Sequence, residues 1–116
     1  MIVTASDAKA SLEAKGLYVS NRISSLWIAA TVEDVGDGVL MSNDACSLIS
    51  NANGWVAVFP AEGLCTYERP GTLEELIATI LAVYEQYRCG GAFTDAFRHV
   101  VPDPDRYVTG RSLARV

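Results

Sequence analysis

Residues 72–91 decide the fold; they read TLEELIATILAVYEQYRCGG. Thr72 and Glu75 have the spacing of a capping box, in which the threonine hydroxyl accepts from the amide of Glu75 and the carboxylate accepts from the amide of Thr72. Apolar side chains then recur at helical spacing, at Leu73, Leu76, Ile77, Ile80, Leu81, Tyr84 and Tyr87. The opposite side carries Glu74, Thr79, Glu85 and Gln86, and Gly90-Gly91 ends the pattern. The stretch predicts a long amphipathic helix.

The segment before this helix has the character of a series of strands. Runs rich in aromatic and β-branched residues occupy positions 17–19, 26–32, 39–41, 46–49, 55–59 and 64–67. Asn53-Gly54 predicts a two-residue hairpin turn with positive φ at both positions, and Gly36-Asp37-Gly38 predicts a second tight reversal. Such short connections favour an antiparallel meander over a parallel sheet, which needs long crossovers.

Both ends of the chain extend this pattern. A helix is expected from about Ser6 to Lys15, capped by Thr4 or Ser6 and ended by Gly16 in a positive-φ conformation. A short helix is expected at 94–99, and residues 106–116 fit a strand, a docked arm or a frayed tail. We therefore predict a single α+β domain over residues 1–116, with an N-terminal helix, an antiparallel meander of about five to six strands and a long helix packed on the sheet.

Charge narrows the class of partner. The chain of 116 residues has 9 Lys and Arg against 14 Asp and Glu, a net charge of −5, and residues 1–87 hold most of the acidic groups. An acidic body repels phosphate backbones, which disfavours nucleic-acid binding, and attracts basic proteins. No apolar run approaches the roughly 20 residues of a membrane span. The first residues lack the pattern of a secretory signal, so we expect a cytoplasmic protein that does not bind membranes.

The sequence offers little for catalysis. Cys46, Cys65 and Cys89 include no Cys-x-x-Cys pair, so we expect reduced core residues rather than a zinc site completed by His99. We expect that histidine, the only one in the chain, to sit at a helix end, where its partial charge suits the dipole. No nucleophile elbow or phosphate-cradling loop is present. We therefore predict no catalytic residue, no cofactor and no metal.

Acidic residues near predicted turns are the candidates for partner binding. They are Glu33, Asp34, Asp37, Asp44 and Glu62. Side chains in turns project into water and can reach a partner without disturbing the core. A second cluster, Asp103-Pro104-Asp105, is interpreted as solvated turn formers. The aromatic residues Trp27, Trp55 and Tyr67 are expected in the core, with an exposed binding platform as the alternative.

A family resemblance points the same way. Residues 54–60, with Trp55, followed by Gly71-Thr72-Leu73-Glu74-Glu75, resemble a layout common among immunity proteins of bacterial polymorphic, contact-dependent inhibition type toxins. There a strand hairpin with a tryptophan runs into a capped helix. The resemblance covers about the middle third of the chain. It implies a small acidic cytosolic domain that occludes a cognate basic toxin, in some cases a nuclease.

The leading hypothesis is therefore a toxin-neutralising immunity protein, acting by stoichiometric binding as a monomer or homodimer. One alternative is a type III secretion-type chaperone or adaptor. Class-typical chaperones place a helix between two groups of strands, whereas here the strands run uninterrupted to the long helix, which counts against that alternative. A small enzyme is the other alternative, disfavoured by the single histidine and the absence of a catalytic motif.

Overall fold

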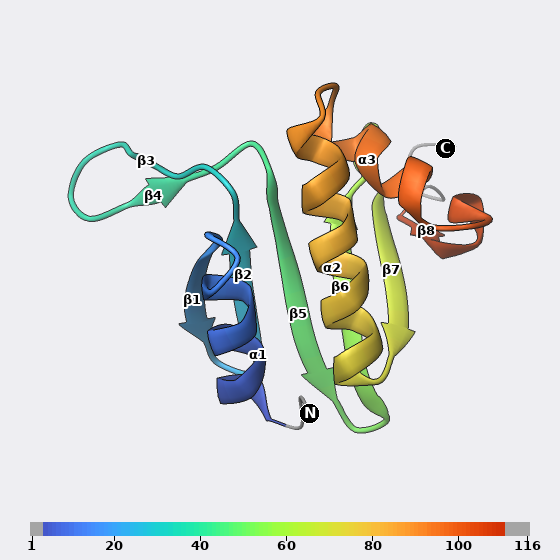
Figure 1. Cartoon of the computed structure of the whole chain (residues 1–116), viewed down its shortest axis with the longest axis horizontal. Coiled ribbons are helices and arrows are strands. Elements are labelled where there is room, and N and C mark those ends of the chain that lie inside the picture. Colours follow the sequence, from blue (N-terminus) through green and yellow to red (C-terminus); the bar gives the residue numbers. More distant parts are fainter. Residues whose placement is uncertain (1–3, 111–116) are drawn as a thin grey trace.

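An antiparallel sheet with helices on one face forms the body of the protein (Figure 1). The structure, a computed structural model, describes residues 4–110. Its elements are α1 (Ala5–Glu13), β1 (Tyr18–Arg22), β2 (Ser25–Ala29), β3 (Glu33–Asp34), β4 (Leu40–Met41), β5 (Ala45–Asn51), β6 (Gly54–Pro60), β7 (Thr66–Gly71), α2 (Leu73–Arg88), α3 (Phe93–Val100), the 3-10 turn η1 (Pro104–Tyr107) and β8 (Val108–Thr109).

Six strands form the main sheet, in the order β1-β2-β5-β6-β7-β8, and every neighbouring pair is antiparallel. Strands β3 and β4 pair only with each other. The predicted α+β architecture is confirmed: an N-terminal helix, an antiparallel meander and a long helix on the sheet. The structure places a short strand at 108–109, within the region predicted as strand, docked arm or tail, while 111–116 lie outside the described residues.

The core lies between the sheet and its helices. Alternate strand residues point toward α2, among them Ile28, Leu48 and Phe59, and all three are buried. Helix α2 meets them with Ile80 and Tyr84, as the helical spacing predicted. The remaining alternate residues face the other side of the sheet, where the described residues place no helix (Figure 1). The core is therefore one-sided.

The start of α2 matches half of the predicted capping box. Thr72 Oγ1 accepts from the amide of Glu75 at 3.2 Å. The Glu75 carboxylate accepts from the Thr72 hydroxyl at 2.9 Å, not from the Thr72 amide. The same hydroxyl therefore accepts one hydrogen bond and donates another. The full reciprocal box occurs at α1 instead, where Thr4 rather than Ser6 is the N-cap and pairs with Asp7.

One α2 residue was misplaced by its polarity. Thr79 was predicted on the solvent side, but it is buried. Its hydroxyl accepts from Arg69 Nη1 at 2.7 Å and donates to the carbonyl of Glu75 at 3.1 Å. A buried hydroxyl is tolerated when its hydrogen bonds are made. The hydrogen bond from Arg69 of β7 therefore allows Thr79 to be buried, contrary to the prediction.

The two predicted reversals have different outcomes. Asp37 and Gly38 have φ of 53° and 76°, the positive values expected of a tight hairpin turn. The β5–β6 hairpin also forms, but Asn51 pairs with Gly54, so Ala52 and Asn53 are the central residues. Gly54 has a φ of 132°, whereas Asn53 is not in the positive-φ region, so that part of the prediction is wrong. The Asn51 side chain accepts from the Asn53 amide at 2.9 Å and shifts the turn by one residue.

The cysteines divide by position. Cys46 is buried in β5, as predicted for a core residue, but Cys65 is half-buried and Cys89 is exposed at the end of α2. His99 lies in the last turn of α3, the helix-end position predicted for it.

Tyr67 is buried and stacks on Phe97, with ring centroids 4.3 Å apart. Trp27, predicted in the core, is only half-buried on the open face of the sheet.

Candidate functional site

A hairpin arm, residues 31–43, leaves the sheet after β2 and returns before β5. Its legs pair Glu33 with Met41 and Asp34 with Leu40. In Figure 1 the arm extends outward beyond β1, the strand at that edge of the sheet. It is the largest excursion of the described chain from the body, and it carries three of the five predicted partner-binding residues.

Local hydrogen bonds, rather than core packing, shape the tip of the arm. The Val39 amide donates to the Gly36 carbonyl at 2.9 Å, and the Val35 amide donates to the Val39 carbonyl at 3.0 Å. The Gly36 amide donates to Asp34 Oδ1 at 2.9 Å. Gly36 has a φ of 109°, in the region where only glycine is free of strain. The tip is thus a compact turn that leaves its side chains in water.

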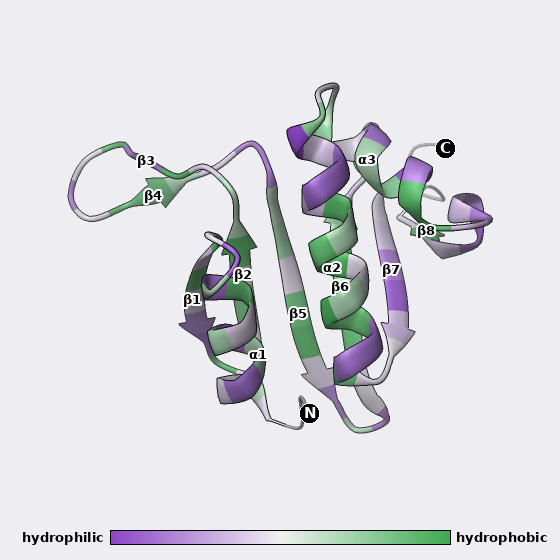
Figure 2. Cartoon of the chain, viewed as in Figure 1, coloured by the Kyte–Doolittle hydropathy of each residue, from purple (hydrophilic) through white to green (hydrophobic). Residues whose placement is uncertain are grey.

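The arm exposes two kinds of side chain together. Glu33, Asp34 and Asp37 are exposed, as predicted. Four apolar side chains of the arm are also exposed, with fractions of 52% for Val35, 53% for Val39, 36% for Leu40 and 57% for Met41. Figure 2 shows the division along the hairpin, with β3 hydrophilic and β4 hydrophobic. Single exposed apolar residues are ordinary, but a group rimmed by charges is typical of a protein-binding surface.

The sequence does not predict that these apolar residues are exposed, because the run 39–41 has the pattern of a strand in the main sheet. The short distance in sequence between residues 33–34 and the glycines that follow them indicates the separate hairpin. Gly36 and Gly38 turn the chain so early that the following strand pairs with 33–34 before it can reach the sheet. A two-residue ladder has no second layer to cover it, so its apolar side chains stay exposed.

Asp44, the fourth candidate, stands at the base of the arm and is fully buried. Its expected projection into water is therefore wrong. Asp44 Oδ1 accepts from the amides of Ala30 and Thr31 at 3.1 and 3.0 Å and from the Ser42 hydroxyl at 2.7 Å, and Oδ2 accepts from the Thr31 hydroxyl at 2.8 Å. The carboxylate satisfies backbone amides where the two legs part from the sheet, a role that requires burial.

These hydrogen bonds set the charge state of the carboxyl. Burial by itself raises the pKa of Asp44, but the bonds from Thr31 and Ser42, with a contribution from Tyr87, outweigh it and leave the pKa below its ordinary value. Tyr84 reinforces the junction from α2, since its hydroxyl donates to the carbonyls of Asp44 at 2.7 Å and Ile28 at 3.1 Å. The base of the arm is therefore anchored to the body.

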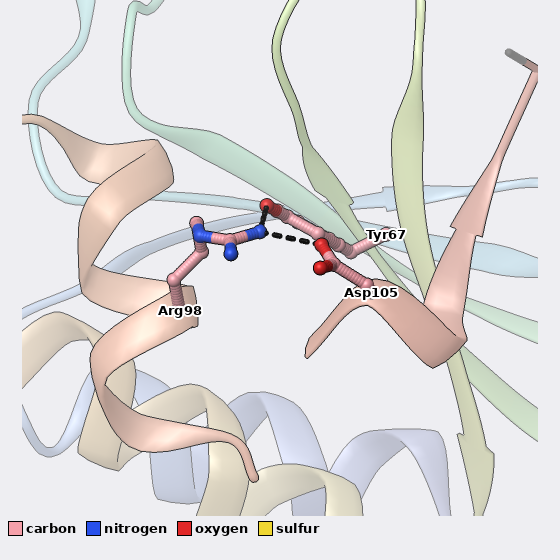
Figure 3. Close-up of polar contacts among 3 residues, drawn as sticks. All are labelled: Tyr67, Arg98 and Asp105. Atoms are coloured by element: carbon pink, nitrogen blue, oxygen red, sulfur yellow. Dashed lines mark hydrogen bonds and ion pairs between the residues drawn. The ribbon is translucent and has the colours of Figure 1, made fainter. Parts of the chain in front are cut away.

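Glu62, the fifth candidate, lies on another loop. It is exposed between β6 and β7 and lines a depression of about 400 Å³ with Cys65 and Arg98. Arg98 Nη1 donates to Asp105 Oδ1 at 2.8 Å and to the Tyr67 hydroxyl at 3.0 Å (Figure 3). The structure thus ties Asp105, predicted to be a solvated turn former, to α3, and the pairing raises the pKa of Arg98.

Topology relates the arm to Glu62. Because neighbouring strands run antiparallel, the last residues of β2 and β6 and the first residues of β5 and β7 lie at the same end of the sheet. The arm and the Glu62 loop therefore leave the body at one end. Glu33, Asp34 and Asp37 form one acidic group on the arm, while Glu62 belongs to a separate depression and Asp44 to the interior.

The buried thiol of Cys46 is not activated as a nucleophile. Burial raises the pKa of the Cys46 thiol to about 12, so the thiol is protonated at neutral pH.

Within residues 4–110, no three His, Cys, Asp or Glu side chains gather closely enough to share a metal ion. No helix in that range is both long and apolar enough to cross a bilayer. Comparison with protein-family models, curated proteins and solved structures finds no match.

Proposed function

We propose that this protein is a stoichiometric inhibitor that binds a basic protein partner through the arm, and that the partner is a bacterial toxin neutralised in the cytoplasm. One observation carries the proposal: three exposed carboxylates and four exposed apolar side chains share a hairpin of 13 residues, 31–43, on an anchored base. The body supplies the anchor and the arm supplies the contact surface.

The two kinds of side chain have different tasks in such a complex. Carboxylates attract a basic partner over several ångströms and raise the association rate, an effect that salt screens. Apolar side chains at the centre of a contact lose water on binding and so slow dissociation. The hydrogen bonds at Asp44 hold the arm in place before binding, so less conformational freedom is lost when the complex forms.

The assignment of the partner as a toxin rests on the resemblance to immunity proteins in residues 54–60 and 71–75 and on the net charge of −5. Toxins that cleave nucleic acid have basic clefts, and an acidic arm that fills such a cleft blocks the substrate without any chemistry of its own. The residues assigned to this contact are Glu33, Asp34 and Asp37 as the charged set and Val35, Val39, Leu40 and Met41 as the apolar set.

The test uses the product of the adjacent gene as the partner. Association rates at low and high salt are compared for the wild type and a Glu33→Gln, Asp34→Asn, Asp37→Asn variant. We expect the variant to associate about tenfold more slowly at low salt and to lose most of its salt dependence. The matched control neutralises three exposed carboxylates away from the arm, at Glu13, Glu74 and Glu85, and should retain most of the wild-type rate.

Two results would contradict the proposal at different levels. No complex at micromolar concentration removes the inhibitor function for that partner. A complex that forms equally fast with the arm variant and the control variant keeps the inhibitor but removes the arm as its binding surface.

A further inference from the structure

The two outer edges of the main sheet are finished in different ways. On one side, β8 pairs with Thr66 and Tyr67, and the rest of β7 carries Glu68, Arg69 and Pro70. Charges and proline on an edge discourage another strand from pairing there. On the other side, β1 contains neither proline nor glycine, its one charged residue is Arg22 at its last position, and the described residues provide no strand beyond it. From Tyr18 to Asn21 the β1 edge therefore lacks the proline and the charges that β7 carries.

The direction of the free backbone groups on β1 follows from a hydrogen bond one strand away. The Ser50 amide donates to the Ser24 carbonyl at 2.9 Å, which makes Ser25 and Ile49 a non-hydrogen-bonded pair in the β2–β5 ladder. Ser25 therefore directs its amide and carbonyl toward its β1 partner, Arg22. Since alternate residues point in opposite directions, Val19 and Asn21 direct theirs to the outer edge.

We propose that β1 pairs with β1 of a second copy of this chain, antiparallel and centred on Ser20. In this register Val19 of one copy faces Asn21 of the other, so the residues with outward amides and carbonyls exchange hydrogen bonds in both directions. Ser20 then faces its own symmetry mate as a non-hydrogen-bonded pair. The two sheets join into one, related by a twofold axis through Ser20.

Side chains on the open face suit the same register. Tyr18 of one copy lies opposite Arg22 of the other, and the pair occurs twice by symmetry. Arg22 already stacks over Trp27 in its own chain, with its guanidinium carbon 5.4 Å from the ring centroid, and Tyr18 meets the same ring at 5.9 Å. A second tyrosine extends this cation–π cluster. No like charges face each other, which favours a second copy as the occupant of the edge.

The same twofold axis brings an exposed apolar side chain of one copy towards the arm of the other. Ile23, in the turn after β1, is 98% exposed. The arm extends beyond β1 at the Tyr18 end of that strand (Figure 1), and its residues Gly38 and Leu40 line a hollow together with Tyr18, Ser20, Arg22 and Trp27. The axis carries Ile23 of the second copy to this end. The exposed Ile23 side chain of each copy is thus placed at the end of the sheet from which the arm of the other copy leaves.

The experiment uses charge at the symmetry axis. Ser20→Glu and Ser20→Lys each place two like charges face to face, so each variant alone should dissociate at least about tenfold more readily than the wild type. Mixed together, the two variants should form a one-to-one heterodimer. Molar mass by light scattering over a dilution series is the measurement, with twice the 12.5 kDa chain mass expected for the wild type. The inference goes beyond the proposed inhibition and needs no toxin.

Controls separate pairing from folding. Ser47→Glu and Ser47→Lys alter a serine on the same open face but on the interior strand β5, so both should remain dimeric. Asn21→Pro removes an outward amide and should give a monomer with an unchanged circular dichroism spectrum, whereas Asn21→Ala should stay dimeric. A wild type that stays monomeric to submillimolar concentration overturns the inference. So does a dimer that neither Ser20 variant weakens, or a pair of weakened variants that fail to complement each other.

Discussion

The arm and helix α2 are segments of similar length that are stabilised in opposite ways. Helix α2 buries Leu76, Ile77, Ile80, Val83 and Tyr84 against the sheet. The arm buries almost nothing and is held by turn hydrogen bonds at its tip and by Asp44 at its base. Substitutions in α2 should therefore change stability, whereas substitutions at the tip of the arm are free to change binding. The contrast is what a separate binding element on a stable body requires.

The largest effect should follow from truncating the core face of α2. Leu76→Ala or Ile80→Ala should lower the free energy of unfolding by about 2–5 kcal/mol, because each removes a buried side chain and leaves a cavity. Chemical denaturation measures the change. A near-neutral result would show that this face does not form the core and would abolish the contrast with the arm.

A smaller loss is expected at the base of the arm. Asp44→Ala should cost about 2–3 kcal/mol, because the amides of Ala30 and Thr31 lose a buried acceptor. Hydrogen exchange should accelerate at residues 30–44 more than in α2. Equal acceleration throughout would mean that Asp44 stabilises the whole domain rather than the junction.

Acidity tests the same junction without a mutation. Because the folded-state pKa of Asp44 is lowered, its contribution to stability is present above the unfolded value of about 3.9 and is lost as the pH falls through the folded-state pKa. The urea midpoint should fall with acidification below about pH 4, and less steeply in Asp44→Ala than in the wild type. If the urea midpoint falls equally steeply with pH in the wild type and in Asp44→Ala, Asp44 does not contribute to the loss of stability in acid.

The helix start should respond more weakly still. Thr72→Ala removes the acceptor for the Glu75 amide and should lower the free energy of unfolding by about 1 kcal/mol. Thr72→Ser keeps the hydroxyl and serves as the control in the same denaturation experiment. A midpoint that does not differ between the two variants would contradict the cap.

The smallest effect on stability should come from the arm itself. Val39→Ser with Met41→Ser should change the free energy of unfolding by less than about 0.5 kcal/mol, since both side chains are already exposed. If the arm binds the proposed partner, the same variant should dissociate from it faster. A large loss of stability here would mean that the arm is part of the packed structure after all.

Prediction succeeded where short-range chemistry dominates and failed where distant residues meet. Gly36-Asp37-Gly38 turns as expected because positive φ is a property of the local chain. Asn53-Gly54 was shifted by the Asn51 side chain, which competes for the same amide. Thr79 was placed in water because its partner, Arg69, lies on another element. Three of the five acidic candidates share one arm, but Asp44 was lost to the interior by the same kind of distant contact.

The sequence by itself determined the long helix, the hairpins and the α+β order, because apolar periodicity, caps and glycines act within a few residues of themselves. Only the tertiary structure decided which polar side chains are buried, which face of the sheet stays open and which edge stays unpaired. Those outcomes depend on which strands become neighbours. Pairing across the sheet sets β1 at the border, lifts residues 31–43 out of the ladder and closes the base of the arm over Asp44.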